Sequence, residues 1–395
     1  MKDRNEIVLS VNKEEKIQIT MWSDEKIKAF RKAILEWYDE NRRDLPWRQN
    51  TEAYDVWVSE IMLQQTRVDT VIPYFQRFMD AFPTIKDLAT ADTEHLLKMW
   101  EGLGYYSRAR NMQVAAQQIM EEYKGEFPSN IQSILTLKGI GPYTGGAIAS
   151  IAFGLPEPAI DGNLMRVTSR LFEVDADIAK ASNRKIFDAI LRELIDPERP
   201  GDFNQALMDI GATLSMPTQY IEEGNPLVPF DQSYQKGTWM NYPVKTKKKK
   251  AKPVNYDAIA IRNKKGEWLV EQRPAKGLLA GMWHFPLFER EAMSKKDWKE
   301  FEEGKELYLI EQAKEKYGLN RSDSLEKVAE VKHVFTHLIW TIQLYVVEAH
   351  DIDPPENCLW VSDQETSDLV FPVPQQKMWD AIPSKMLNKI NNELD

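Results

Sequence analysis

The spacing of apolar residues changes near residue 215 and divides the chain into two regions. Before that point, apolar residues recur every three or four positions between short connections that carry Pro, Gly or Asn, which is typical of amphipathic helices. The first region is therefore predicted to be all-α. Helices are expected over residues 24–42, 55–65, 69–82, 92–100, 106–123, 131–137, 142–153, 163–172, 183–195 and 203–214.

Apolar and polar residues alternate after about residue 254, which predicts strands. Residues 256–274 should form a hairpin, residues 337–349 another strand and residues 305–319 a helix, so this region is predicted to be α+β. The stretch between the regions has prolines, glycines and a lysine run, which suits a linker. The expected organisation is an N-terminal extension over 1–20, a helical domain over 21–225, a linker over 226–253 and an α+β domain over 254–395.

Composition limits the class of protein. The length of 395 residues suits two domains. The one cysteine, Cys358, rules out an intramolecular disulfide and a cysteine-ligated metal site, and it favours a reducing compartment. No apolar run reaches the roughly 18 residues of a membrane span. The net charge of −10 argues mildly against nucleic acid, but binding faces are local. We expect a cytoplasmic monomer, nucleoid-associated in a bacterium, with no membrane partner.

A glycine-rich turn, LKGIGPYTGG, interrupts the helices at residues 137–146. Gly139 and Gly141 permit positive φ and close backbone approach, and Pro142 suits the first turn of a following helix. Such a turn presents exposed N–H groups that bind a phosphate without a charged side chain. The alternative is a helix–turn–helix link that only packs.

Two carboxylates stand out near this turn. Glu60 lies among apolar neighbours in VWVSEIMLQQTRV, and Asp161 lies before a helix in AIDGNLMRV. Desolvation should raise the pKa of Glu60 and keep its proton available. Taken singly, Glu60 could be an exposed helix glutamate and Asp161 an N-cap.

These segments together carry a family resemblance. LKGIGPYT followed by Asp161 resembles the helix–hairpin–helix DNA glycosylases of the endonuclease III superfamily. LPWR, SEIMLQQTRV, WEGLGYYSRARN and DGNLMRV are similar to the adenine glycosylases of the MutY family. The resemblance implies that the hairpin grips the DNA backbone, with an alkali or calcium ion at the turn as the one candidate ion and no required cofactor.

The resemblance also implies roles for the site residues. Glu60 protonates N7 of adenine, and Asp161 stabilises the oxocarbenium ion that forms on the sugar. Asn163 orients the carboxyls or the water. Tyr143 stands where bifunctional relatives carry a Schiff-base lysine, so the enzyme should excise the base and leave the strand uncut.

Base flipping requires residues that fill the vacated space and line a pocket. The resemblance assigns the first task to Gln65 and Tyr105, assisted by Leu103. Arg108, Arg110 and Lys138 are candidates for phosphate contacts, although each could equally be a solvated surface charge. The expected lining and adenine contacts are Trp47, Arg48, Leu63, Thr66, Val68 and Gln205. For Trp47, Leu63 and Val68 the alternative is core packing, which a pocket wall also satisfies.

The second domain is similar to Nudix domains in GLLAGMWHFPLFE, but its metal-binding helix is altered. Gln312 and Lys316 occupy glutamate positions, so the domain should bind without hydrolysing. Phe335, Thr336 and His337 match the loop that inspects 8-oxoguanine in this family. His337 has a structural histidine as its alternative.

Most members of the family hold an iron–sulfur cluster on four cysteines. Here Ser215 stands at the first of those positions and no cysteine follows it in residues 216–244, so we expect a clusterless enzyme. The expected partner is double-stranded DNA containing an 8-oxoguanine:adenine pair. Competing interpretations are a thymine or uracil mismatch glycosylase and a catalytically silent lesion-binding protein.

Overall fold

A computed structural model describes residues 6–10, 16–247, 250–290, 308–320, 324–349 and 352–384. The chain folds into two compact units. The first, the helical unit, comprises residues 1–91 and 107–247, and the second, the sheet unit, comprises residues 92–106 and 248–395. Among the described residues, no helix has the length and apolar character that a bilayer crossing requires.

The helical unit follows the predicted apolar pattern closely. Ser23 caps the first helix as expected, its Oγ accepting a hydrogen bond from the Lys26 amide at 3.3 Å. A short helix over Ile85–Thr90 was not expected, because six residues are too few to show a helical period. The helices are α1 Asp24–Asn41, α2 Ala53–Leu63, α3 Val68–Ala81, α4 Ile85–Thr90, α6 Ser107–Glu122, α7 Ile131–Ile134, α8 Pro142–Phe153, α9 Gly162–Phe172, α10 Arg184–Leu194, α11 Pro200–Thr213 and α12 Gln232–Gln235.

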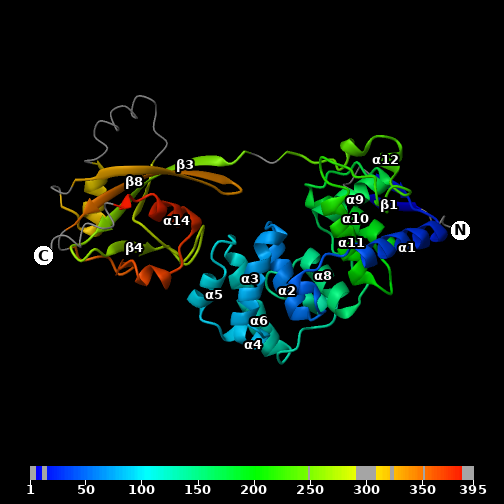
Figure 1. The fold of residues 1–395 in the computed structure, drawn as a ribbon, viewed down its shortest axis with the longest axis horizontal. Helices are drawn as coiled ribbons and strands as arrows, with labels where there is room; N and C mark the ends of the chain where they lie inside the picture. The colour runs from blue at the N-terminus through cyan, green and yellow to red at the C-terminus, as the bar shows by residue number, and fades with distance from the viewer. Residues whose placement is uncertain are drawn as a thin grey trace. The chain divides into compact units, whose positions relative to one another are not determined.

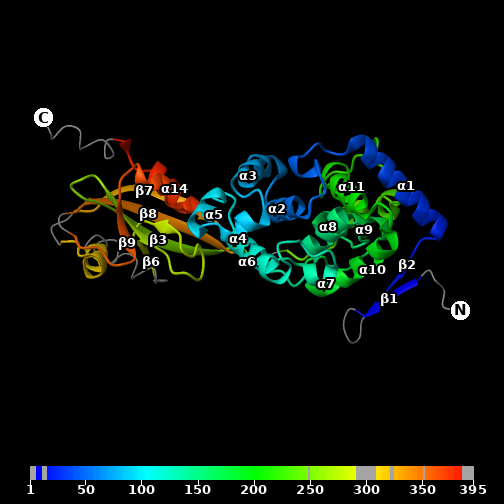
Figure 2. The same cartoon turned by 90° about the horizontal axis from the view of Figure 1, so that it is seen from below.

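One hydrophobic core holds α1, α9, α10 and α11 side by side (Figures 1 and 2). Trp22 stacks on Phe172 with ring centroids 4.6 Å apart, and Phe30 meets Phe230 edge-on at 5.2 Å. A two-stranded antiparallel ladder, β1 Glu6–Ser10 with β2 Lys16–Thr20, precedes α1 where the sequence suggested only an extension. This core fixes α9 and α11, two of the helices whose side chains line the pocket described below.

The hairpin between α7 and α8 uses its two glycines differently from the expectation. Gly139 has a φ of +81°, and a Cβ there would lie 2.8 Å from the Asn111 Cβ. Gly141 has a φ of −95°, so it does not adopt positive φ, and a Cβ built there would meet no atom within 4 Å. Pro142 is the first residue of α8, and no side chain caps that helix. The turn therefore leaves open space at an uncapped helix N-terminus.

Residues 215–247 pack on the helical unit, whereas the sequence assigned residues 226–253 to a linker. Leu227 is fully buried, and Phe230 joins the core of α1 and α9. Farther along, the Asp177 carboxylate accepts hydrogen bonds from the Thr246 amide, at 3.1 Å, and from the Thr246 hydroxyl. The segment thus behaves as part of the helical unit almost to the lysine run.

The sheet unit contains a seven-stranded mixed sheet in the order β5-β4-β3-β8-β7, with β6 on β3 and β9 on β4. The predicted hairpin is present as the antiparallel pair β3 and β4, while β3 and β8 run parallel. The strands are β3 Lys252–Arg262, β4 Trp268–Gln272, β5 Trp283–His284, β6 Leu287–Glu289, β7 Glu326–Val334, β8 Leu338–Glu348 and β9 Cys358–Val361.

Alternation along β3 places two cores on the two faces of the sheet. Ala258 and Ala260 face the cluster that includes α14 (Val373–Asp380), whereas Ile259 and Ile261 face the helix described over residues 308–317. This arrangement confirms the α+β prediction.

Residues 92–106 belong to the sheet unit, although the sequence placed them in the helical domain. The Lys98 ammonium of α5 (Thr93–Met99) binds the Leu369 carbonyl at 2.9 Å, and the Glu101 carboxylate accepts from the Phe371 amide at 3.0 Å. Helical periodicity predicts an element but carries no information about these partners, which lie some 270 positions along the chain.

We predict that Gly139→Ala destabilises the full-length protein by about 1–3 kcal/mol, because alanine would need a strained left-handed backbone and would collide with Asn111. Gly141→Ala is the matched control and should change the free energy of unfolding little. Denaturant unfolding followed by the helical circular dichroism signal measures both. Equal effects of the two substitutions would contradict this reading of the hairpin.

Candidate active site

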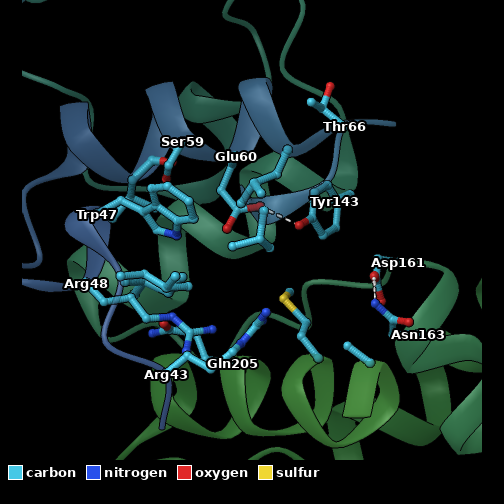
Figure 3. Close-up of a pocket in the computed structure, with 17 residues that line it drawn as sticks. Arg43, Trp47, Arg48, Ser59, Glu60, Thr66, Tyr143, Asp161, Asn163 and Gln205 are labelled. Atoms are coloured by element: carbon cyan, nitrogen blue, oxygen red, sulfur yellow. Dashed lines mark hydrogen bonds between the residues drawn. The ribbon is translucent and has the colours of Figure 1, made fainter. Parts of the chain in front are cut away.

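A pocket of about 210 Å³ opens within the helical unit, between η1 (Pro46–Arg48), α2, α8, α9 and α11 (Figure 3). Its walls bring together residues that lie more than a hundred positions apart in the sequence. The expected site residues that line it are Trp47, Arg48, Glu60, Leu63, Thr66, Val68, Tyr143, Asp161, Asn163 and Gln205. The lining residues that the sequence did not single out include Arg43, Ile151, Met208 and Ala212.

Glu60 enters the pocket from the middle of α2 and is only 6% exposed. The pKa of this carboxyl is raised to about 7, because burial and, to a lesser extent, the nearby Asp161 charge outweigh the opposing effects of hydrogen bonding and of Arg48. The hydrogen bond comes from the Tyr143 hydroxyl, which donates to Oε2 (Figure 3). The phenol of Tyr143 is thus a direct partner of the Glu60 carboxyl, and the Asp161 charge acts on both groups.

Asp161 is the N-cap of α9 and also lines the pocket, so the two interpretations that the sequence offered for this residue are compatible. Its Oδ1 accepts from the Leu164 amide at 2.7 Å, and its Oδ2 accepts from the Asn163 side-chain amide at 2.9 Å. Burial raises the pKa of Asp161, and these donors together with the Arg166 charge act in the opposite direction. The two carboxyls thus share one pocket but differ in how many donors stabilise the charged form.

Opposite the carboxyls, a buried aspartate orders two arginines. Asp209 on α11 is 1% exposed and accepts both Arg48 Nη1 at 2.7 Å and Arg43 Nε at 2.9 Å. The guanidinium of Arg48 is thereby fixed beside Gln205 on the pocket wall. Sequence reasoning missed Asp209 and Arg43, because an ion pair across 166 positions has no local signal.

Arg108 has a structural task in place of the phosphate contact that the sequence suggested. Its Nη1 binds the carbonyls of Ile61 and Gln64 at 2.6 and 2.9 Å, which satisfies the end of α2. The helix that carries Glu60 is thus capped by a side chain from α6. Lys138 remains exposed beside the hairpin, with its amide bound to the Gln118 side chain at 2.8 Å.

The residues expected to occupy the space of a flipped base lie outside this pocket. Gln65 in the helical unit has a φ of 60°, and Tyr105 in the sheet unit has a φ of 48°, both rare for side chains of this size. Leu103 is 7% exposed. Within the sheet unit, the Tyr105 hydroxyl bonds to the Thr336 hydroxyl, so two of the predicted DNA-reading residues are neighbours.

The loop of Phe335, Thr336 and His337 joins β7 to β8. Phe335 packs edge-on against Trp340 at 4.9 Å and against His333 at 4.4 Å, which fixes the base of the loop. Thr336 and His337 are exposed. The loop therefore presents a hydroxyl and an imidazole on a rigid aromatic support.

Lys316, which the resemblance places at a metal-binding glutamate position, forms an ion pair instead. Lys316 Nζ binds Glu271 Oε1 at 2.7 Å, and the Tyr317 hydroxyl donates to Oε2 at 2.6 Å. Over the ranges that the structure describes, no group of three or more His, Cys, Asp or Glu side chains is placed to hold a metal ion.

The residues at the position where the family resemblance implies an iron–sulfur cluster do not fit that group. Ser215 is buried and hydrogen-bonded to Arg170, and the protein's one cysteine, Cys358, lies on β9. Serine is a poor substitute for a thiolate ligand of iron. The segment that follows Ser215 is held by aromatic packing, with Tyr220 stacked on Tyr234 at 4.4 Å.

Two family models match parts of this chain. Residues 58–195 match the HhH-GPD superfamily base excision DNA repair protein family, and residues 257–381 match the NUDIX domain. The chain is 34% identical over 400 residues to the adenine DNA glycosylase of Homo sapiens, covering 86% of this chain and 71% of that protein. It is 32% identical over 360 residues to the adenine DNA glycosylase of Buchnera aphidicola subsp. Schizaphis graminum, covering 89% and 98%.

Among solved structures, a thermostable thymine-DNA glycosylase aligns at 26% identity and a TM-score of 0.48 over 54% of this chain and 98% of that one. The family assignment rests on the curated relatives, which extend across both units. The chain belongs to the adenine DNA glycosylase family.

Proposed function

We propose that this enzyme excises adenine mispaired with 8-oxoguanine or guanine in duplex DNA, as a monofunctional glycosylase of base excision repair. The observation that carries the proposal is the pairing of Glu60 and Asp161 in one pocket with different surroundings. Membership of the adenine DNA glycosylase family supports the same substrate.

The chemistry needs one protonated and one ionised carboxyl group. Glu60, with a pKa near 7, gives its proton to N7 of the flipped adenine. The C1′–N9 bond then breaks, its electron pair leaves with the purine, and positive charge develops on the sugar. Asp161 stabilises that charge, and Glu60, now ionised, takes a proton from the water whose oxygen adds to C1′.

The pocket also supplies groups that fit a purine. Arg48, fixed by Asp209, and Gln205 offer hydrogen-bonding atoms at one end, while Trp47, Leu63 and Val68 offer apolar walls. Tyr143 places a phenol beside Glu60, and a phenol cannot form a Schiff base. We therefore propose excision without strand cleavage.

Recognition of the opposing base is assigned to the loop of Phe335, Thr336 and His337. Its support is the exposure of Thr336 and His337 on a rigid aromatic base and the bond between Thr336 and Tyr105. Phosphate binding at the hairpin is assigned to the uncapped start of α8, where Gly141 leaves open space. The alkali or calcium ion at this turn stays a prediction.

An excision assay on duplexes that pair A, T or U with 8-oxoguanine or guanine tests the proposal. We expect release of adenine alone, and a loss of at least about 10²–10⁴-fold in single-turnover rate for Glu60→Gln and for Asp161→Asn. Both variants should still bind the duplex, and Glu52→Gln at the start of α2 should be fully active. Release of T or U in preference to adenine would contradict the substrate, and normal rates in either variant would remove that residue from its role.

We predict that the excision rate falls as pH rises through about 7, because Glu60 must carry its proton and burial raises its pKa to that value. Tyr143→Phe removes a donor that favours the charged carboxylate, so this alkaline limb should move to higher pH. Tyr54→Phe is the control: it removes a buried hydroxyl of α2 that binds the Phe82 carbonyl at 2.8 Å. It should leave the pH of the alkaline limb unchanged. A shift of the Tyr143→Phe limb to lower pH would refute the assignment.

We predict that Thr336→Val lowers the preference for 8-oxoguanine over guanine opposite adenine by about twofold to tenfold, the value of one hydrogen bond. Val334→Thr changes an exposed residue at the end of β7 and serves as the control. The measured quantity is the ratio of single-turnover rates on the two duplexes. An unchanged ratio in Thr336→Val would place recognition elsewhere.

A further inference from the structure

A chain of hydrogen bonds runs from Asp161 to the segment that follows α11. The Asn163 amide binds Asp161 Oδ2 at 2.9 Å, and Asn163 Oδ1 accepts from Arg166 Nη2 at 2.8 Å. Arg166 Nε then donates to the Ser215 carbonyl at 2.8 Å. Arg170 Nη1 donates to the Ser215 hydroxyl at 2.7 Å. Each link therefore restrains the next, and Asp161 is the end that reaches the pocket.

The far end of this chain is held by aromatic rings. The Arg170 guanidinium lies 4.9 Å from the centre of the Trp239 ring and 5.8 Å from that of Tyr220. Tyr220 is itself fixed, since its hydroxyl donates to Asp231 at 3.0 Å and its ring stacks on Tyr234. Arg170 Nε also reaches the Tyr242 carbonyl at 3.3 Å. Residues 215–242 thus form a binding site for the Arg170 side chain of α9.

Repulsion between two buried arginines explains why α9 needs this binding site. Arg166 and Arg170 are 7% and 0% exposed and lie one turn apart on the same helix, so their charges repel. Burial and the Arg166 charge lower the pKa of Arg170 to about 10. The negative groups that offset the two charges are Asp161 at one end and Asp231 at the other. Removing the contacts between residues 215–242 and Arg170 would free Arg170 to move, and Arg166 with it.

Packing leaves the middle of the chain little room. Gly211 on α11 accepts from Arg166 Nη2 at 2.7 Å through its carbonyl, and a Cβ at Gly211 would lie 2.8 Å from the Asn163 Cβ. Asn163 is thus confined between Arg166 and α11. A shift of Arg166 would therefore displace Asn163, and with it the Asp161 carboxylate that Asn163 binds.

We propose that residues 215–242 orient Asp161 through the chain Arg170–Ser215–Arg166–Asn163, which makes Arg170 and Ser215 positioning residues for base excision. The proposal deepens the proposed function and rests on it. Neither residue touches the pocket, and both act through Asn163. Misplacement of a reacting group by about 1 Å costs up to roughly 10²-fold in rate, which is the size of effect to expect.

Ser215→Ala is the sharpest variant, because it removes the hydroxyl that binds Arg170 and keeps the carbonyl that binds Arg166. In the full-length protein we expect its single-turnover excision of adenine to slow by about tenfold or more, with duplex affinity unchanged. Thr168→Val on α9 is the matched control and should keep the wild-type rate, since its buried hydroxyl has no hydrogen-bond partner in the described part of the chain. Trp239→Leu weakens the same anchor and replaces Ser215→Ala if that variant does not fold.

Two readouts separate positioning from a general loss of stability. The acid limb of the pH–rate profile should move to higher pH in Ser215→Ala, because Asn163 and Arg166 lower the pKa of Asp161 in the intact chain. In an Asn163→Ala background, Ser215→Ala should cause no further loss, since the path to Asp161 is already cut.

A Ser215→Ala variant with the wild-type excision rate overturns the proposal. So does a double variant whose loss of rate equals the product of the losses in Ser215→Ala and Asn163→Ala alone. A wild-type protein that excises adenine from no duplex rejects the proposed function itself.

Discussion

The proposed chemistry requires two buried carboxyls in one pocket to hold different protonation states, and the contacts around them bear on that requirement. Burial alone raises the pKa of both Glu60 and Asp161 and would not separate them. The separation comes from the donors on Asp161, namely the Leu164 amide and the Asn163 side chain, with the Arg166 charge behind them. Glu60 accepts one hydrogen bond, from the Tyr143 hydroxyl, and the Arg48 charge also favours its ionised form. The proposed acid is therefore the carboxyl that accepts fewer hydrogen bonds.

The fold positions these groups through contacts between distant segments. The helix carrying Glu60 ends on the Arg108 guanidinium of α6, and Asp161 begins a helix whose two arginines reach the segment after α11. Asp209 holds Arg48 at the opposite wall in the same way. Buried charges of this kind are costly to leave unpaired, so each one fixes its partner as well as itself.

The sequence predicts the elements better than their partners. Apolar periodicity locates the helices and strands, and motif resemblance singles out Glu60 and Asp161, which line one pocket, because both signals are local. The partner of Tyr143, the cap formed by Arg108 and the grouping of residues 92–106 with the sheet unit were not predicted, because each depends on a contact between segments far apart in the chain. Gly141 shows a related limit: a glycine in a turn need not adopt positive φ, and here its φ is −95°.

The pKa of Glu60 tests the central claim most directly. In full-length protein labelled with [δ-¹³C]glutamate, the Glu60 signal is assigned by its loss in Glu60→Gln, and its carboxyl shift is followed by NMR from about pH 4 to 9. The account predicts a midpoint of about 7. A midpoint near the ordinary value of 4.5 would contradict it, because Glu60 would then be ionised at neutral pH and hold no proton for the leaving purine.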